Sequence, residues 1–243
     1  MPYLLSLSGD LTRVFLNDDR YKFLLTGFLN TLKITAGALL MGVIIGIAVA
    51  AVRSSYDKNY ESLKLRGGVG YGILSVLNSV CKLYLTVIRG TPVVVQLMIM
   101  YFVIFKATTN GVVVGIIAFG INSGAYVAEI FRGGIMSIDN GQFEAGRSLG
   151  FNYFQTMRYI IIPQMFKATL PTLLNEFIAL LKETSVSGYV GVIELTKAGN
   201  IIAGRTFNYV LPLTVVALTY LLTVSVLSSL VGRLERRLRK SER

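Results

Sequence analysis

The chain has no histidine and only one cysteine, and this scarcity excludes several kinds of chemistry. Zinc and most transition metals are held in proteins by clusters of histidine, cysteine and carboxylate side chains. The sequence has no cluster with metal-ligand spacing, so a membrane-bound metalloenzyme is not expected. The lone Cys81 cannot form an internal disulfide, and it gives no information about redox conditions.

The sequence also lacks a glycine-rich phosphate loop of the GxxxxGK[ST] type, which cradles the phosphates of ATP in many ATPases. The chain is therefore not expected to hydrolyse ATP, and any energy source must come from a partner. No internal repeat is present either, so the inverted halves that are common in secondary transporters are missing.

Charged residues are scarce as well: they make up 15% of the 243 residues, whereas hydrophobic residues make up 53%. This composition is too apolar for an ordinary soluble domain. A helix needs about 20 apolar residues to cross a bilayer. Five stretches qualify, namely Thr26–Val52, about Ile73–Phe105, Val112–Ile130, Gln164–Leu181 and Tyr209–Val231. The sequence predicts an all-α membrane protein with five transmembrane helices, in which residues 1–243 form one domain.

The basic residues indicate how these spans are oriented, because lysine and arginine resist translocation and mark the cytoplasmic side. The densest basic block is the tail, residues 233–243, so we place the C-terminus inside and, after five spans, the N-terminus outside. The polar stretch 140–163 and the loop Ser54–Gly72, which shows no clear periodicity, then also lie inside. The net charge of +11 indicates topology and contact with anionic lipids. Nucleic-acid binding is not expected, because the basic residues do not form one face.

One of these cytoplasmic stretches is the most informative part of the chain. Residues 144–150 read EAGRSLG, and residues 160–163 read IIIP. Two short helices are expected to meet at Gly150, because glycine accepts the left-handed conformation that ends a helix. Asn152 and Gln155 can cap the second helix. A helical hairpin of this kind is shaped to dock into a groove on a soluble partner, and an ordinary interfacial loop is the alternative.

The second span is interrupted at Arg89-Gly90-Thr91-Pro92. Backbone amides and carbonyls exposed by a break are tolerated in a membrane only where protein or a water-filled cavity satisfies them. The break therefore indicates a pathway or an interface. A helix that simply begins at Pro92 near the membrane surface is the alternative.

Polar side chains inside the predicted third and fourth spans form two stripes at helical spacing. The first stripe is Asn122, Tyr126 and Glu129 with Ser123 beside it, and the second contains Glu176 and Glu183. A carboxylate that faces lipid costs several kcal/mol, so both stripes should face protein or water. Each stripe can be explained as a contact between helices, but two stripes near one backbone break favour a shared hydrophilic cavity.

The hairpin resembles the coupling motif of permease subunits in bacterial ABC importers. The matching pattern is Glu144-Ala145-Gly146, then Gly150, Ile160 and Ile162-Pro163. Four further stretches resemble the polar amino acid branch of that family: residues 89–97, 121–135, 141–142 and 175–185. Two positions depart from the pattern. Gly146 replaces the usual alanine, which should loosen the helix by about 1 kcal/mol, and Glu183 stands where aspartate is common.

The resemblance implies the permease subunit of a polar amino acid importer, of the histidine, glutamate, glutamine, arginine or opine type, in the bacterial cytoplasmic membrane. It implies the type I permease fold and alternating access, in which ATP binding closes the nucleotide subunits and the docked hairpin moves with them. The implied partners are two ATP-binding cassette subunits, a second permease subunit, identical or paralogous, an extracytoplasmic amino-acid-binding protein, the amino acid and membrane lipids. ATP and magnesium belong to the partner ATPase, and no cofactor is expected in this chain.

The resemblance and the polar stripes together suggest which residues carry these roles. We expect the ATPase to be contacted by Glu144, Ala145, Gly146, Gly150, Phe151 and Phe154. We expect the substrate cavity to be lined by Thr91, Gln96, Asn122, Ser123, Tyr126, Glu129, Glu183 and Thr184. Three acids in the membrane, Glu129, Glu176 and Glu183, suggest tolerance for cationic amino acids.

Two other classes of function compete with this interpretation. A passive channel or secondary transporter is disfavoured by the missing repeat, the odd number of spans and the specific hairpin. A structural subunit of a membrane complex would use the polar stripes for packing alone, and uptake that survives its deletion would favour that alternative.

Overall fold

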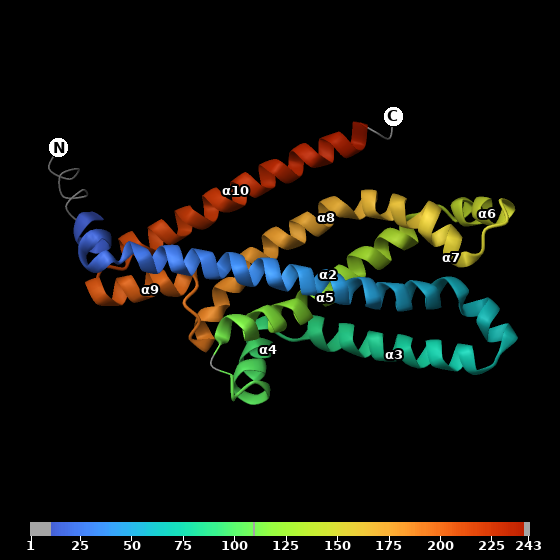
Figure 1. The fold of residues 1–243 in the computed structure, drawn as a ribbon, viewed down its shortest axis with the longest axis horizontal. Coiled ribbons are helices and arrows are strands. Elements are labelled where there is room, and N and C mark those ends of the chain that lie inside the picture. The colour runs from blue at the N-terminus through green and yellow to red at the C-terminus, as the bar shows by residue number, and fades with distance from the viewer. Residues whose placement is uncertain (1–10, 109, 241–243) are drawn as a thin grey trace. The chain divides into compact units, whose positions relative to one another are not determined.

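The computed structural model describes residues 11–108 and 110–240, and these are helical with no strand among them. Figure 1 shows the order of the elements. The long helices are α2 (Tyr21–Arg66), α3 (Val69–Gly90), α5 (Gly111–Ser137), α8 (Ile162–Glu183) and α10 (Val210–Lys240). The shorter helices are α4 (Val93–Ile99), α6 (Asn140–Ser148), α7 (Tyr153–Thr156) and α9 (Leu195–Thr206). Short π-helices lie at η1 (Thr12–Leu16), η3 (Met100–Ile104) and η4 (Met157–Ile161), and 3-10 helices lie at η2 (Asn17–Asp19) and η5 (Thr184–Val190). The predicted all-α fold is confirmed.

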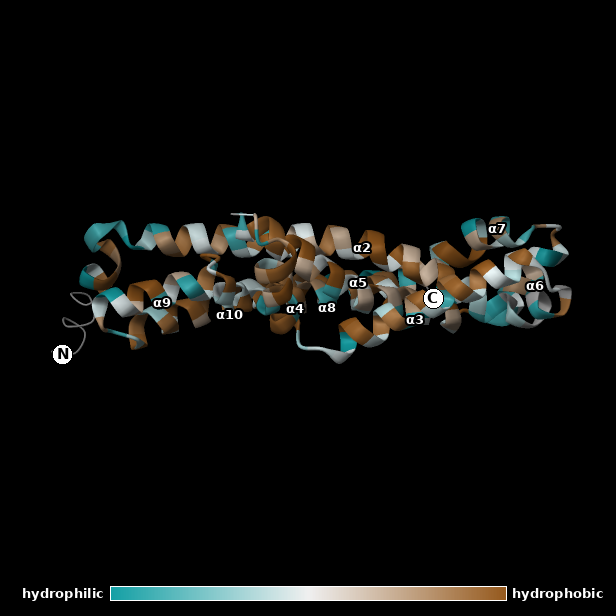
Figure 2. Cartoon of the chain, turned by 90° about the horizontal axis from the view of Figure 1, so that it is seen from below, coloured by the Kyte–Doolittle hydropathy of each residue, from teal (hydrophilic) through white to brown (hydrophobic). Residues whose placement is uncertain are grey.

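Within the described residues, four helices are long and apolar enough to cross a membrane. These stretches are Tyr21–Lys58, Val69–Gly90, Gly111–Ser137 and Val210–Leu238. The predicted fourth span, Gln164–Leu181, lies in α8, which is 22 residues long but is not among these four. The count of five spans and the placement of the N-terminus outside stay predictions. Figure 2 shows hydrophobic segments along α2 and hydrophilic segments at α6.

The expectation of a loop at Ser54–Gly72 is wrong, because α2 continues as a helix through Arg66. Only Gly67 and Gly68, with φ of 62° and 95°, separate it from α3. The extension has no apolar periodicity because its polar side chains meet polar partners: Asp57 pairs with Arg132, and Lys58 donates to Asn140. A hydrophobic pattern therefore cannot reveal this helix.

The interruption predicted at residues 89–92 is confirmed. Helix α3 ends at Gly90, Thr91 has extended backbone (φ −123°, ψ 147°), and α4 begins at Val93. Pro92 has no backbone donor and favours an extended residue before it, so the helix cannot run through this point. The Thr91 hydroxyl donates to the carbonyl of Val87 at 2.8 Å and so satisfies one acceptor of the final turn of α3.

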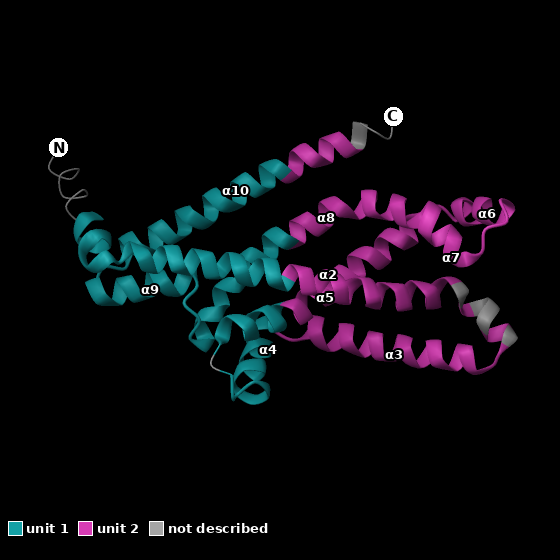
Figure 3. Cartoon of the chain, viewed as in Figure 1, with its two compact units in different colours: residues 1–38, 93–119, 177–230 teal, residues 39–92, 120–176, 231–243 magenta. Residues whose placement is uncertain are grey.

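The chain divides into two compact units (Figure 3). Unit 1 comprises residues 1–38, 93–119 and 177–230, and unit 2 comprises residues 39–92, 120–176 and 231–243. An apolar cluster of unit 2 joins α2, α5, η4 and α8 through Ala50, Val127, Phe131, Ile135, Ile161 and Met165. Close approach of α2 to α5 requires glycine at position 46, where a Cβ atom would lie 2.5 Å from Val127 Cγ1.

Unit 1 is organised around a buried carboxylate. Glu194 is 0% exposed and caps α9 by accepting from the backbone amides of Thr196 at 2.7 Å and Lys197 at 2.6 Å. The Tyr220 hydroxyl of α10 also lies 3.4 Å from this carboxylate. Helix α2 approaches so closely that a Cβ atom on Gly27 would lie 2.7 Å from the Glu194 carbonyl oxygen. The Glu194 side chain therefore ties α9 to α10, while its backbone lies against α2.

Candidate coupling hairpin and substrate cavity

The hairpin is built as its sequence predicts. Helix α6 begins after Asp139, whose carboxylate accepts from the Gly141 amide at 2.6 Å. Gly150 has a φ of 78°, which is the left-handed conformation expected there. Asn152 and Gln155 then form a reciprocal capping box with two hydrogen bonds of 2.9 Å, and α7 follows. The two short helices meet at Gly150 as expected.

Gly146 is where the two helices of the hairpin touch. It is buried, and a Cβ atom built on it would lie 2.6 Å from both Cγ2 and Oγ1 of Thr156. Thr156 is itself 2% exposed, and its hydroxyl donates to the Asn152 carbonyl at 3.1 Å, so it has little freedom to move away. The departure from the usual alanine therefore has a local cause, because a threonine occupies the space that a methyl group would need.

Apolar side chains cover the outer surface of the hairpin. Leu149 and Phe154 are each 70% exposed, and Tyr159 is 62% exposed. Phe151 lies with its ring 6.0 Å from that of Tyr159. Phe151 and Phe154 were expected to contact the ATPase, and that role stays a prediction. Leu149 and Tyr159 were not among the expected contacts, although both are large apolar residues exposed on this polar hairpin.

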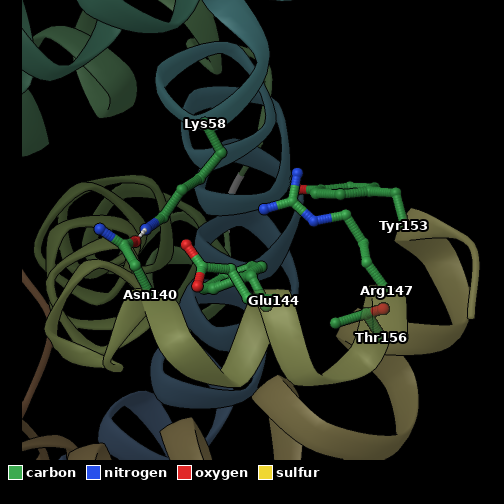
Figure 4. A pocket seen from close by; sticks show the side chains of 7 residues that line it. Lys58, Asn140, Glu144, Arg147, Tyr153 and Thr156 are labelled. Atoms are coloured by element: carbon green, nitrogen blue, oxygen red, sulfur yellow. Dashed lines mark hydrogen bonds between the residues drawn. The ribbon is translucent and has the colours of Figure 1, made fainter. Parts of the chain in front are cut away.

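A cavity of about 450 Å³ lies between the hairpin and the extension of α2 (Figure 4). Its lining residues are Lys58, Asn140, Phe143, Glu144, Arg147, Tyr153 and Thr156. The Lys58 ammonium donates to the Asn140 side-chain oxygen at 2.8 Å and lies 4.5 Å from the centre of the Phe143 ring. Glu144 and its neighbour Ala145 are exposed, and within the described part of the chain Glu144 forms no ion pair. This carboxylate is available to an external partner.

A second cavity of about 450 Å³ lies in unit 2 beside the interruption that follows α3. Its lining residues are Arg53, Lys82, Leu85, Thr86, Arg89, Gly90 and Glu129. Glu129 is paired with Arg132 at 3.0 Å, and the Arg89 guanidinium lies 5.6 Å from the centre of the Tyr126 ring. The wall that contains Glu129 therefore carries more positive than negative charge.

Two other predicted cavity residues are enclosed by unit 2. Ser123 is 0% exposed and donates to a carboxylate oxygen of Glu176 at 3.2 Å, and Asn122 is 4% exposed. In this conformation the stripe on α5 is thus divided. Asn122 and Ser123 are buried within the unit, whereas Glu129 lines the cavity and Tyr126 is partly exposed. A movement of the helices is needed before Asn122 or Ser123 can touch a substrate.

The remaining predicted substrate residues lie on or beside other helices. Thr91 is exposed at the end of α3 in unit 2. In unit 1, Gln96 is half-buried on α4, Glu183 is exposed at the end of α8, and Thr184 is buried and donates to the Leu181 carbonyl at 2.8 Å. The roles of all eight residues in substrate binding stay predictions.

A helical membrane chain with a capped polar hairpin and no nucleotide loop is the kind of protein that forms the membrane-embedded part of an ATP-driven importer. The chain belongs to the family of binding-protein-dependent transport system inner membrane components, whose pattern matches residues 65–240. It is 34% identical to the putative glutamine transport system permease protein GlnP of Rickettsia typhi over 219 residues, 89% of this chain and 93% of that protein. It is 38% identical to the glutamine transport system permease protein GlnP of Escherichia coli K12, over 73% of this chain and 87% of that protein.

Solved structures agree with these relatives. A crystal structure of an amino acid ABC transporter with histidines is 36% identical and matches with a TM-score of 0.77, covering 92% of this chain and 98% of that one. An inward-facing MetNI methionine ABC transporter shares the fold, with a TM-score of 0.74, at 19% identity over 90% of this chain and 97% of that one. The chain is therefore the permease subunit of an amino acid ABC importer, a multi-pass inner membrane protein. The ATPase activity lies in the partner subunit, and permeases of this kind work with ATP-binding subunits and a substrate-binding protein, typically as a dimer.

Proposed function

We propose that this permease carries polar amino acids, glutamine among them, by alternating access, and that its ATPase subunits drive it through the hairpin of residues 140–163. A second permease subunit, either a second copy or a paralogue, completes the pathway. The observation that supports this most directly is the hairpin itself. An exposed carboxylate, Glu144 on α6, lies near two exposed apolar side chains, Leu149 in the turn after α6 and Phe154 on α7.

This surface combines the two features of an interface that has to transmit force. Apolar side chains such as Leu149 and Phe154 gain free energy when they are removed from water, at about 25 cal/mol per Å² of buried area. A carboxylate such as Glu144 adds orientation, because it pairs well with a basic side chain or with the N-terminus of a helix. The groove on the ATPase is therefore expected to be apolar with one positive group.

Replacing Glu144 with lysine tests the docking role. We expect Glu144→Lys to reduce substrate-stimulated ATPase activity at least about tenfold in proteoliposomes, because a like charge now faces the positive group of the groove. Insertion into the membrane should be unchanged, since the side chain is exposed and supports no internal contact. Glu235→Lys, which makes the same change of charge on α10, is the matched control. Stimulation of Glu144→Lys at the wild-type level would contradict the assignment.

The charges in unit 2 favour a neutral polar substrate over a cationic one. Of the three acids expected in the membrane, Glu129 is paired with Arg132, and Glu176 accepts from Ser123. Arg53 and Arg89 add positive charge to the cavity that Glu129 lines. The glutamine permeases named above are in accord with this, and the structure with histidines extends the substrate class to a larger polar side chain. The third acid, Glu183, is exposed at the end of α8 in unit 1.

The variant Glu183→Gln tests whether the transporter also accepts a cationic amino acid through Glu183. If Glu183 receives a cationic side chain, the ATPase response to arginine should fall about tenfold or more, the usual loss for a hydrogen bond to a charged group. The response to glutamine should change less than about twofold. The measurement is ATPase activity in proteoliposomes with the binding protein and each amino acid in turn. An arginine response equal to that of the wild type would exclude Glu183 as a ligand.

A further inference from the structure

The helical extension of α2 beyond the predicted first span contacts two different helices through adjacent residues. Lys58 donates to Asn140 at 2.8 Å and lies 4.5 Å from the ring centre of Phe143, both on α6. Asp57, its neighbour, pairs with Arg132 of α5 at 3.3 Å. The extension therefore joins the first helix of the hairpin to the helix that carries Glu129.

The contacts continue from α5 into the cavity beside the helix break. Arg132 uses its two terminal nitrogens separately, one toward Asp57 at 3.3 Å and the other toward Glu129 at 3.0 Å. Glu129 lines the basic cavity. Polar contacts thus link Asn140 on the hairpin to Lys58, and Asp57 to Arg132 and Glu129 at the cavity wall, while the helix backbone joins Asp57 to Lys58; all five residues belong to unit 2.

The packing beneath this series makes it suitable for transmitting movement. The Arg132 and Asp57 side chains are each 27% exposed, so their attraction is only partly screened by water. Under them, Ala50 of α2 and Phe131 of α5 belong to one apolar cluster with Ile161, which precedes α8. Packed interiors are dense and transmit displacement instead of absorbing it. Phe143 of α6 packs against the same cluster, so the contacts of Lys58 with Asn140 and with the Phe143 ring lie where the hairpin meets this packed interior.

We propose that the α2 extension transmits movement between the ATPase-docking hairpin and the cavity, with Lys58 as the positioning residue that ties the hairpin to it. The proposal rests on the docking function proposed above. Movement of α6 displaces Lys58 and, through Asp57 and Arg132, the carboxylate of Glu129. By linkage, occupancy of the cavity alters the position of α6 and hence the ATPase. This role also assigns a function to the helical extension of α2 that follows the predicted first span.

The test uses the complete transporter in proteoliposomes with its binding protein. Lys58→Met keeps the length of the side chain and removes its charge and donors, so the ratio of substrate-stimulated to basal ATPase activity should fall about fivefold. The ATPase subunits should still co-purify, and basal activity should stay within about twofold of the wild type. Lys58→Arg keeps the positive charge and the donors, so its ratio of substrate-stimulated to basal ATPase activity should stay near that of the wild type. Lys64→Met is the matched control, because Lys64 lies on the same helix and contacts the Tyr60 ring.

The second arm uses Asp57→Asn, which leaves every hairpin contact in place and still breaks the series. It should lower the same ratio, and Lys58→Met/Asp57→Asn should lower it no further, because the two residues act in one series. Additive losses, or wild-type stimulation in Lys58→Met and Asp57→Asn, would overturn the proposal. If Glu144→Lys uncouples the transporter while these variants do not, the transmission role fails alone. If Glu144→Lys has no effect, the docking function fails with it.

Discussion

Replacing Gly146 with alanine, the residue usual in the family, is expected to weaken the hairpin of this protein. Alanine favours a helix by about 1 kcal/mol over glycine. The added methyl group would lie 2.6 Å from Thr156, however, and overpacking of this kind costs about 1–3 kcal/mol. Thr156 is buried and hydrogen-bonded to Asn152, so it cannot move aside without loss. The clash should therefore outweigh the gain in helix propensity.

Hydrogen exchange of residues 140–160 and substrate-stimulated ATPase activity measure this effect. A net loss of up to about 2 kcal/mol should increase local opening of the hairpin by up to about 30-fold and reduce stimulation correspondingly. Gly146→Ala/Thr156→Ala removes the clash and should recover both. Thr156→Ala alone is the control, since it loses one hydrogen bond and keeps the glycine. A Gly146→Ala variant with stronger protection than the wild type would show that Thr156 has room to shift.

Loss of the Glu194 carboxylate is expected to have the largest effect on stability. Glu194→Ala would remove the acceptor for two backbone amides of α9 and for Tyr220, and leave a cavity where a fully buried side chain lies. Caps of this kind contribute about 1–2 kcal/mol, and an emptied buried site costs about 2–5 kcal/mol. We expect a lower melting temperature in detergent and faster hydrogen exchange in residues 195–206. Glu235→Ala removes an acid from α10 as a control, and an unchanged α9 in Glu194→Ala would contradict the assigned role.

The same carboxylate should make α9 sensitive to pH. Burial raises the pKa of Glu194 above its ordinary value of 4.5, although the hydrogen bonds from Thr196 and Lys197 oppose this. Because the folded pKa is the higher one, the stabilising contribution is complete below pH 4.5 and is lost as the pH rises through the folded value. Exchange protection of α9 should therefore decrease toward neutral pH, and Glu194→Gln, which does not titrate, should remove this dependence. The same pH profile in both proteins would assign the effect to another group.

Much of the hairpin could be predicted from the sequence because its signals are local. Gly150 has the expected left-handed conformation, and Asn152 with Gln155 forms the expected capping box. The interruption after Gly90 was predicted for a similar reason, since proline removes a donor wherever it stands. The extension of α2 was missed because its polar residues are satisfied by residues about 75 and 82 positions away, a distance over which no periodicity operates.

The class of this protein was predictable from the sequence: a helical membrane chain without a nucleotide loop, with a capped polar hairpin between apolar spans and a polar break in its second apolar region. These features depend on composition, helix caps and prolines, which act over a few residues. Which polar groups are paired and which are exposed depends on the tertiary structure. It paired Glu129 with Arg132, buried Ser123 against Glu176 and left Glu144 exposed. Whether a carboxylate is available depends on the side chains that folding brings beside it, and those come from distant parts of the chain.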